Sequence, residues 1–313
     1  MQNLRKLFQQ NCIRCLIFLV LLILIFSYLS PYFVSLSNFD NILSASAVTG
    51  LLALGVTFVI ASGGIDLSIA SVMALAATVS AYFAQSLGLG ASSAFAICLL
   101  VGTICGAVTG LLVNITRAPS FIVTLGMLSV ARALAYIVAD GTPIYGLPAA
   151  LTEIGQGKLL GISIPVIILI VASLVAHFIL HKSVFGVQSL LYGDSNFAAE
   201  VMGVRVDPLR LKIYSLCGLF AGVAGFIFMA RTNAGDPTAG QNYELIAITA
   251  VILGGTKLFG GRATILGTLF GVLCLGVLQN GLNLLAVSTY YQVLFVGMVL
   301  IGAAMMERLG SEQ

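Results

Sequence analysis

Long runs of apolar residues, separated by short polar connections, follow one another along the whole chain. Most of them approach the length of about 20 residues that an α-helix needs to cross the hydrocarbon core of a bilayer. The runs cover residues 15–30, 42–62, 69–86, 93–115, 120–139, 162–180, 212–230, 245–258, 264–283 and 289–306. We therefore predict an all-α polytopic membrane protein of about ten transmembrane helices, built as a single domain over residues 1–313.

The scarcity of charge excludes other classes of protein. Only 8% of the 313 residues are charged, whereas a soluble globular protein carries about 25% charged residues. So few charges could not cover a water-exposed surface, which excludes a soluble enzyme and a disordered chain. The 34 glycines are typical of membrane helices, in which small residues let backbones approach closely. The net charge of +3 is too small to indicate nucleic-acid binding.

The positions of the basic residues predict the orientation of the chain. If the amino terminus lies in the cytoplasm and the spans alternate, 11 of the 14 Lys and Arg residues fall on the cytoplasmic side. These are Arg5, Lys6, Arg14, Arg117, Lys182, Arg205, Arg210, Lys212, Lys257, Arg262 and Arg308. Lys158 and Arg231 fall outside, and Arg132 falls within the fifth span. An excess of cytoplasmic Lys and Arg is the usual pattern of membrane proteins, so we predict that both termini are cytoplasmic.

The sequence contains no motif for catalysis or for a cofactor. It has no G-x-x-x-x-G-K-[ST] loop to hold phosphates, so we expect no ATPase activity of its own. Cys12 and Cys15 form a C-x-x-C pair, but no second Cys or His pair accompanies it to complete a zinc site. We therefore expect neither metal nor cofactor, and a transport role in place of an enzymatic one.

A weak internal repeat connects two of the predicted spans. Gly106 to Gly110 in the fourth span and Gly267 to Gly271 in the ninth both read G-x-x-x-G, and these spans run in opposite directions. Inverted repeats are common in transporters. The alternative is that G-x-x-x-G is only a common pattern of helix packing.

Two polar segments fall where the alternating topology predicts cytoplasmic connections. In Ser62–Ser68, two glycines precede Asp66, which is predicted to cap the third span and, in the alternative, also to hold a gate or a subunit contact. The loop 181–211 contains a short helix that Asp194 or Ser195 can cap and Gly203 can close in the left-handed conformation. Ala198 and Ala199 leave a flat side suited to docking, and Asp207 is expected to cap the next span ahead of Pro208. Such a helix could receive force from a separate motor, although it could also be an ordinary connection.

Three further features are polar. Segment 236–244, with Asp236, Tyr243 and Glu244, lies on the predicted outer side and could face a soluble partner or cap a helix. Segment 254–262 holds two Gly pairs and is predicted to be a re-entrant or hinge segment near the cytoplasmic side. An Arg within a span, such as Arg132, costs several kcal/mol to bury. It is therefore predicted either to line a path or gate, or to pair with carbonyls.

Several motifs in order carry a resemblance to a known family. They are Ser-Gly-Gly-Ile-Asp-Leu-Ser (62–68), Gly-Asp-Ser-Asn-x-Ala-Ala-x-x-x-Gly-Val (193–204), Pro-Thr-Ala-Gly-x-x-Tyr-Glu-Leu-x-Ala-Ile (237–248), Leu-Gly-Gly-Thr-x-x-x-Gly-Gly (253–261), Asn-Gly-Leu-Asn-Leu-Leu (280–285) and Val-Ser-x-Tyr-Tyr-Gln (287–292). Over roughly 38–295 the chain resembles the permease subunits of bacterial ABC importers for simple sugars, of the ribose, xylose and arabinose type.

The resemblance implies an architecture and a set of partners. It implies a dimer, of identical or different permease chains, with a fold similar to that of the vitamin B12 importer. It further implies a cytoplasmic ATP-binding subunit, a periplasmic sugar-binding protein, and import of ribose or a similar monosaccharide across the inner membrane. By this likeness the coupling segment contains Gly193, Asn196, Ala198, Ala199 and Gly203.

The resemblance leaves other site residues as candidates only. Asp66, Arg132, Asn280 and Asn283 are candidates for the translocation path or gate. Asp236, Tyr243 and Glu244 are candidates for contact with the periplasmic partner.

The sequence departs from the family in places. Ile246 follows Glu-Leu where the family usually has Asp, and Asp194-Ser195 stand between Gly193 and Asn196 where Gly-Gly-Asn is common.

An ion-coupled secondary transporter of a small polar solute is the alternative function. It would need carboxylates in the middle of a span, whereas Asp66, Asp140 and Glu244 all lie at the ends of the predicted spans.

Overall fold

The computed structural model describes the backbone of residues 2–311 and the side chains of residues 13–305. The side chains of Arg5, Lys6, Cys12 and Arg308, on which part of the sequence argument rests, lie outside the described residues. The ten long apolar runs fall on the helices α1 Gln2–Leu29, α2 Leu36–Ala61, α3 Ile69–Leu87, α4 Ala91–Thr116, α5 Ser120–Val138, α7 Ile164–Lys182, α10 Val206–Thr232, α11 Tyr243–Leu253, α12 Ile265–Leu284 and α13 Thr289–Ser311.

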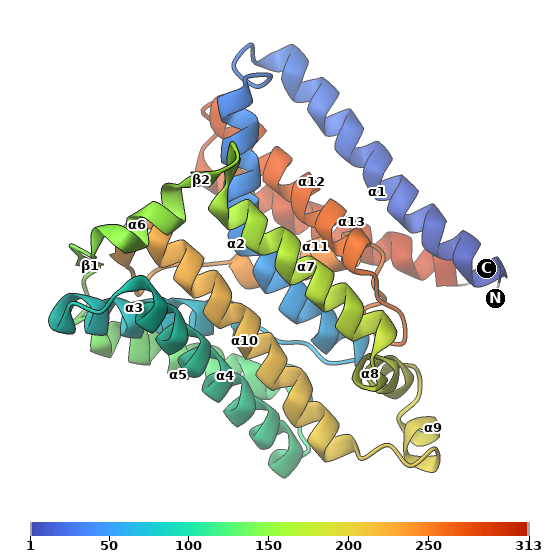
Figure 1. Ribbon diagram of the computed structural model, residues 1–313. Helices are drawn as coiled ribbons and strands as arrows, with labels where there is room; N and C mark the ends of the chain where they lie inside the picture. Colours follow the sequence, from blue (N-terminus) through green and yellow to red (C-terminus); the bar gives the residue numbers. More distant parts are fainter. Residues whose placement is uncertain (1, 312–313) are drawn as a thin grey trace.

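Shorter elements occupy three of the connections between the long helices (Figure 1). One end of the bundle carries α6 Ala149–Gln156 and the strands β1 Ile144–Tyr145, β2 Lys158–Leu159, β3 Ile162–Ser163 and β4 Ala234–Gly235. Strand β1 pairs with β4, and β2 pairs with β3, both antiparallel. The opposite end carries α8 Val184–Asp194 and α9 Asn196–Val201. We refer to these as the α6 end and the α9 end.

The apolar helices are long enough for a multi-pass membrane protein. Among the described residues, α2, α3, α4, α5, α7, α10 and α12 satisfy the length and hydropathy of a membrane span. Ile13–Leu29, Tyr243–Leu253 and Thr289–Met305 are shorter apolar helices. Helix α11 has 11 residues, so it is about 16 Å long, which is roughly half of the hydrocarbon core. The chain is thus a helical, multi-pass membrane protein, and the count of ten spans stays a prediction.

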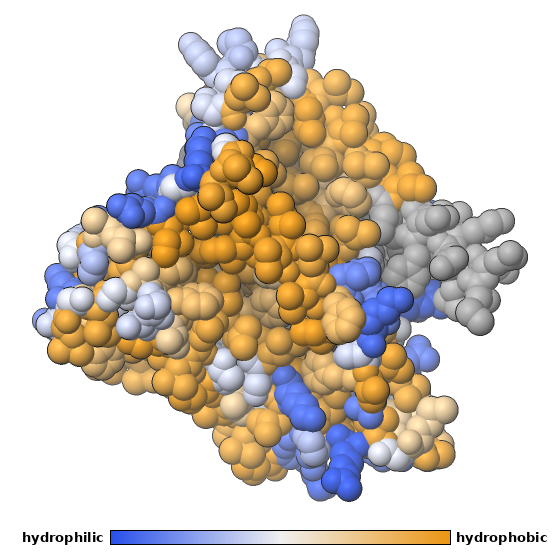
Figure 2. All heavy atoms as spheres, in the orientation of Figure 1, coloured by the Kyte–Doolittle hydropathy of each residue, from blue (hydrophilic) through white to orange (hydrophobic). Residues whose placement is uncertain are grey.

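Helix α2 forms the centre of the bundle. In its most apolar stretch 78% of the residues are buried, compared with 22% in α5, 28% in α7 and 33% in α4. Most of the exposed side chains of α4, α5 and α7 are large and apolar, as expected of a lipid-facing surface. Figure 2 shows apolar side chains over most of the visible face, with hydrophilic ones gathered toward the two ends.

Glycines bring α4 and α10 into backbone contact. A Cβ on Gly106 would lie 2.2 Å from the carbonyl oxygen of Tyr214, and one on Gly218 would lie 2.1 Å from that of Gly102. Small residues at this spacing are the usual basis of close helix packing in membranes.

The two G-x-x-x-G motifs of the predicted repeat face different partners. Gly106 and Gly110 of α4 pack on α10, whereas Gly267 and Gly271 of α12 pack on Gly254 and on Ala250 of α11. Both motifs therefore act in helix packing. The inverted repeat stays a prediction.

Candidate functional site

Helix α9 has the capping predicted from the sequence. The Ser195 hydroxyl accepts a hydrogen bond from the Ala198 N–H at 3.2 Å. At the other end Gly203 has φ +81°, and the Val204 N–H donates to the Ala199 carbonyl at 3.0 Å. A glycine in this left-handed position satisfies the last carbonyls of a helix. The short helix closed by Gly203 is therefore confirmed, with Ser195 as its cap.

The exposed face of α9 differs from the one predicted. Ala199 is fully buried in the chain, whereas Phe197, Val201 and Met202 are 78%, 71% and 73% exposed. Because a six-residue helix has room for one buried side, its small residues turn inward and its large apolar residues turn outward. The prediction that Ala199 lies on a flat docking face is wrong. Asn196 is exposed and Ala198 is half-buried.

The chain around α9 also departs from prediction. Gly193 lies within α8, a helix that the sequence did not predict. Helix α10 begins at Val206 with Arg205 at the N-cap position, so Asp207 is not its N-cap. Asp207 lies in the first turn, where a carboxylate is still favourable beside the free N–H groups.

Three of the polar segments meet at four glycines, Gly63, Gly193, Gly260 and Gly261, which we call the glycine node. A Cβ on Gly193 would lie 2.0 Å from the Ala61 carbonyl oxygen, and one on Gly260 would lie 2.7 Å from the Gly63 nitrogen. The Gly261 N–H donates to the Ala61 carbonyl at 3.0 Å. Gly63, Gly260 and Gly261 have φ between +78° and +87°, a conformation that favours glycine. The node thus joins the end of α2, the end of α8 and the 254–264 connection, backbone to backbone.

Asp66 is fully buried beside the node, at the start of α3. Its Oδ1 accepts hydrogen bonds from the N–H and hydroxyl of Ser68 at 2.8 and 2.6 Å, and its Oδ2 accepts one from the Cys217 thiol at 3.4 Å. Burial raises the pKa of the Asp66 carboxyl, and these hydrogen bonds oppose the rise. Helix α3 begins at Ile69 with Ser68 at its N-cap position, so Asp66 satisfies the N–H of the cap residue. Asp66 is therefore not the N-cap of α3 that the sequence predicted; it binds the residue that occupies that position. A role in a gate stays a prediction.

Arg132 binds the connection that precedes α11. Its Nη1 donates to the carbonyl oxygens of Pro237 and Ala239, at 2.6 and 2.8 Å. The negative charges of Glu244 and Asp236 also act on Arg132. Pairing with carbonyls, one of the two alternatives for this residue, is the arrangement observed.

The three candidates for contact with a periplasmic partner are all half-buried. Asp236 accepts hydrogen bonds from the N–H and hydroxyl of Thr238, both at 2.7 Å. Glu244 lies close enough to Arg132 for the two charges to interact. Tyr243 lies close enough to Arg231 to be influenced by its charge. Because all three are half-buried, a role in partner contact stays a prediction.

Asn280 and Asn283 are engaged in contacts between helices. Asn280 exchanges two amide hydrogen bonds with Asn38 of α2, at 3.0 and 2.8 Å. The Asn283 Oδ1 accepts from Gln292 of α13 at 2.7 Å. The partners Asn38 and Gln292 were missed by the sequence analysis, because one sequence holds no signal for which polar residues pair across helices.

Two further results concern charge and metal. At the α6 end Lys158 forms an ion pair with Asp40 at 2.5 Å, which the sequence did not predict. Over the described side chains, no group of three or more His, Cys, Asp or Glu residues could hold a metal ion.

Together, the apolar helical bundle, the short capped helix at one end and the polar loop held by Arg132 at the other are the features of a multi-pass membrane protein. Residues 38–304 match the family described as "Branched-chain amino acid transport system / permease component". The chain belongs to this family and is thus a permease subunit, not an enzyme.

The chain is also similar to individual curated permeases over nearly its full length. The chain is 42% identical to the ribose import permease protein RbsC of Bacillus subtilis (strain 168), over 93% of this chain and 90% of that protein. It is 40% identical to RbsC of Escherichia coli (strain K12), over 94% and 92% of the two chains. It is also 34% identical to the D-allose transport system permease protein AlsC of the same strain, over 94% and 90%. No solved structure matches the chain.

Proposed function

We propose that the chain is the membrane-spanning permease of an ABC importer that carries ribose or a similar monosaccharide across the cytoplasmic membrane. The observation that carries this proposal is 42% and 40% identity to two ribose import permeases over more than nine-tenths of the chain. The family description names branched-chain amino acids, but near full-length identity to individual permeases is the more specific likeness. A cytoplasmic ATP-binding subunit supplies the energy, and a periplasmic binding protein delivers the sugar.

The test is uptake of labelled ribose by cells that lack their own ribose permease and express this chain with its ATP-binding and sugar-binding partners. We expect uptake that depends on ATP and persists after an uncoupler removes the proton gradient. Uptake that collapses with the uncoupler while ATP remains high would establish the alternative, an ion-coupled secondary transporter. Labelled branched-chain amino acids are tested in the same cells as the alternative substrates.

The proposed topology is a single domain of ten spans in which the α9 end and both chain termini are cytoplasmic. Two such chains form the dimer, in an arrangement similar to that of the vitamin B12 importer. Phe197 of α9 and Tyr145 of β1 are 78% and 62% exposed at opposite ends. A membrane-impermeant maleimide applied to intact spheroplasts should label Tyr145→Cys and should not label Phe197→Cys. The reverse labelling pattern would mean that the chain has the opposite orientation in the membrane.

We also propose that α9 transmits ATP-driven motion. Phe197, Val201 and Met202 offer an exposed apolar face that a groove on the ATP-binding subunit can bury. Gly193 connects the end of α8 to α2 and to the 254–264 connection through the glycine node, which supports a mechanical link from α9 to the spans.

A charge on this face tests the docking. Phe197→Asp should reduce co-purification of the ATP-binding subunit, because a carboxylate would be buried in an apolar interface. Leu160→Asp is the matched control, because Leu160 is 95% exposed at the α6 end. Equal co-purification by both variants would place the docking surface elsewhere, such as 254–262 or beside Arg117.

Arg132 is proposed to hold the outer loop closed over the start of α11. Arg132→Leu removes two hydrogen bonds to carbonyls, so the loop should loosen while the protein still inserts. Thr238, in this loop, is exposed, and Thr238→Cys should be labelled faster in the Arg132→Leu background. Arg132→Lys keeps the charge and is the control. Unchanged labelling together with normal uptake would refute the proposal.

A further inference from the structure

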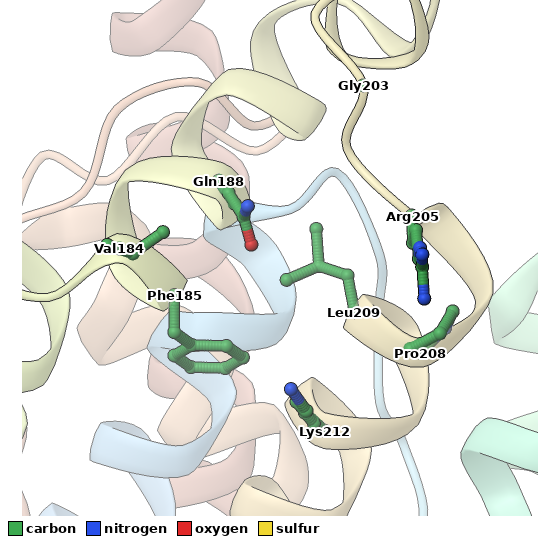
Figure 3. A pocket seen from close by; sticks show the side chains of 8 residues that line it. All are labelled: Val184, Phe185, Gln188, Gly203, Arg205, Pro208, Leu209 and Lys212. Atoms are coloured by element: carbon green, nitrogen blue, oxygen red, sulfur yellow. The ribbon is translucent and has the colours of Figure 1, made fainter.

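An open groove of about 480 Å³ lies between the first turns of α8 and the first turns of α10 (Figure 3). Phe185 and Gln188 line it from α8, and Arg205, Leu209 and Lys212 line it from the α10 side. Leu209 is buried and Phe185 is half-buried, so the base of the groove is apolar, whereas Arg205 and Lys212 are exposed. The groove therefore combines an apolar base with two cations on one wall.

The two cations carry charge that the chain does not neutralise. Among the described side chains neither Arg205 nor Lys212 has an ion-pair partner. The nearby Arg210 is already engaged, since its Nε donates to the Tyr192 hydroxyl at 2.7 Å and its guanidinium lies 5.3 Å from the ring centroid. Arg210 also faces Asp207 at 4.0 Å, the nearest acid along the chain. The groove is thus complementary to an anion.

The surroundings of the groove are those of a membrane surface. Val184, which lines the groove, and Val187 on the same helix are 73% and 58% exposed. Helix α7 ends one residue before α8, and its Leu174 and Phe178 are 67% and 62% exposed. Large apolar side chains exposed in this way indicate contact with lipid. The groove therefore lies where the lipid-facing surface of α7 meets the polar end of the bundle.

We propose that this groove binds the headgroup of an anionic phospholipid. Arg205 and Lys212 would contact the phosphate, the Gln188 amide would donate to a phosphate or glycerol oxygen, and the acyl chains would follow the exposed side of α7. Basic pockets between helices on the cytoplasmic side are suited to anionic headgroups. An acidic segment of a partner protein would also match the cations, but it would leave Val184 and the face of α7 uncovered. The proposal does not depend on which substrate the permease carries.

The experiment measures lipid selectivity of the purified full-length permease by native mass spectrometry, with phosphatidylglycerol and phosphatidylcholine as probes. The unsubstituted protein should retain phosphatidylglycerol at least about tenfold more strongly, because each basic residue near the surface adds attraction for anionic lipid. The double variant Arg205→Gln/Lys212→Gln should lose most of this selectivity. Arg14→Gln/Arg117→Gln is the matched control, since it removes two exposed cations outside the groove, and it should keep the selectivity.

Three outcomes would overturn the proposal. The groove variant could keep the selectivity, or the control could lose as much, which would mean a general effect of charge. The groove variant could instead lose the ATP-binding subunit on co-purification with its lipid selectivity intact, which would assign the groove to the protein partner. Melting in phosphatidylcholine shows whether the variants fold. The charge-retaining pair Arg205→Lys/Lys212→Arg should keep the selectivity if the double Gln variant does not fold.

Discussion

Adding one methyl group to the glycine node should separate coupling from folding. In Gly193→Ala the new Cβ would lie 2.0 Å from the Ala61 carbonyl oxygen and 2.7 Å from the Gly261 nitrogen. A relaxed carbon–oxygen contact is about 3.4 Å, so α8 and the end of α2 must move apart by roughly 1.4 Å. Overpacking of this kind costs about 1–3 kcal/mol, and loss of the Gly261 N–H bond to Ala61 adds about 1 kcal/mol.

The long apolar helices should still insert, because the node lies at the end of the bundle and outside their lipid-facing surfaces. We expect normal amounts of Gly193→Ala in the membrane, ATP hydrolysis by the attached subunit, and uptake reduced by about 30-fold or more if a strain of about 2–4 kcal/mol opposes the coupled motion. The assays are uptake into proteoliposomes and ATP hydrolysis by the same preparation.

Two further variants make the reasoning refutable. In Gly63→Ala the new Cβ meets its nearest atom at 3.4 Å, but Gly63 has φ +78°, where a Cβ costs about 1–2 kcal/mol, so its defect should be present but smaller than that of Gly193→Ala. In Gly126→Ala nothing lies within 4 Å, so uptake should be unchanged. Normal uptake by a folded Gly193→Ala protein, or equal defects in all three, would show that the node does not transmit motion.

The remaining predictions concern assembly of the bundle. Gly106→Val should prevent accumulation in the membrane, because its side chain would meet the Tyr214 carbonyl at 2.2 Å, whereas Gly126→Val should accumulate normally. Asn38→Ala and Asn280→Ala should each lower the melting temperature in detergent, because each change leaves the other amide without its partner. The double variant should lower it little further. Fully additive shifts would contradict the pairing. Asp66→Ala should lose about 1 kcal/mol of stability or more, because it removes the acceptor of two hydrogen bonds from Ser68. Asp66→Asn should lose less, because an amide oxygen can still accept from Ser68.

Local signals in the sequence predicted local structure well. Apolar runs placed the long helices, and the Ser195 and Gly203 caps were found because capping depends on residues three to eight positions apart. The shortest run differs most clearly from its helix at the carboxyl end. The run 245–258 became α11, which ends at Leu253, because Gly254 and Gly255 begin the turn that follows.

Contacts between distant segments could not be predicted in the same way. Gly63, Gly260 and Gly261 were noticed as members of Gly pairs and Gly193 as part of the coupling segment, but nothing in their spacing shows that they meet. The direction of a side chain on a short helix was also hidden, which is why Ala199 was expected at the surface and lies inside. For Arg132, its burial cost indicated a specific partner, and only the structure identified the carbonyls of Pro237 and Ala239.

A joint made only of backbone has a mechanical consequence. Side chains can change rotamer and absorb a small displacement, but the contact of Gly193 with Ala61 and Gly261 contains no rotatable group. A shift of α8 by an ångström must therefore displace α2 or the 254–264 connection by a similar amount, with almost no play. A substitution that opened a gap there should allow ATP hydrolysis without transport. A substitution that added atoms there should block the relative motion of α8 and α2. Substitutions at the end of α2, at the end of α8 and in the 254–264 connection are thus expected to occur together when related permeases diverge.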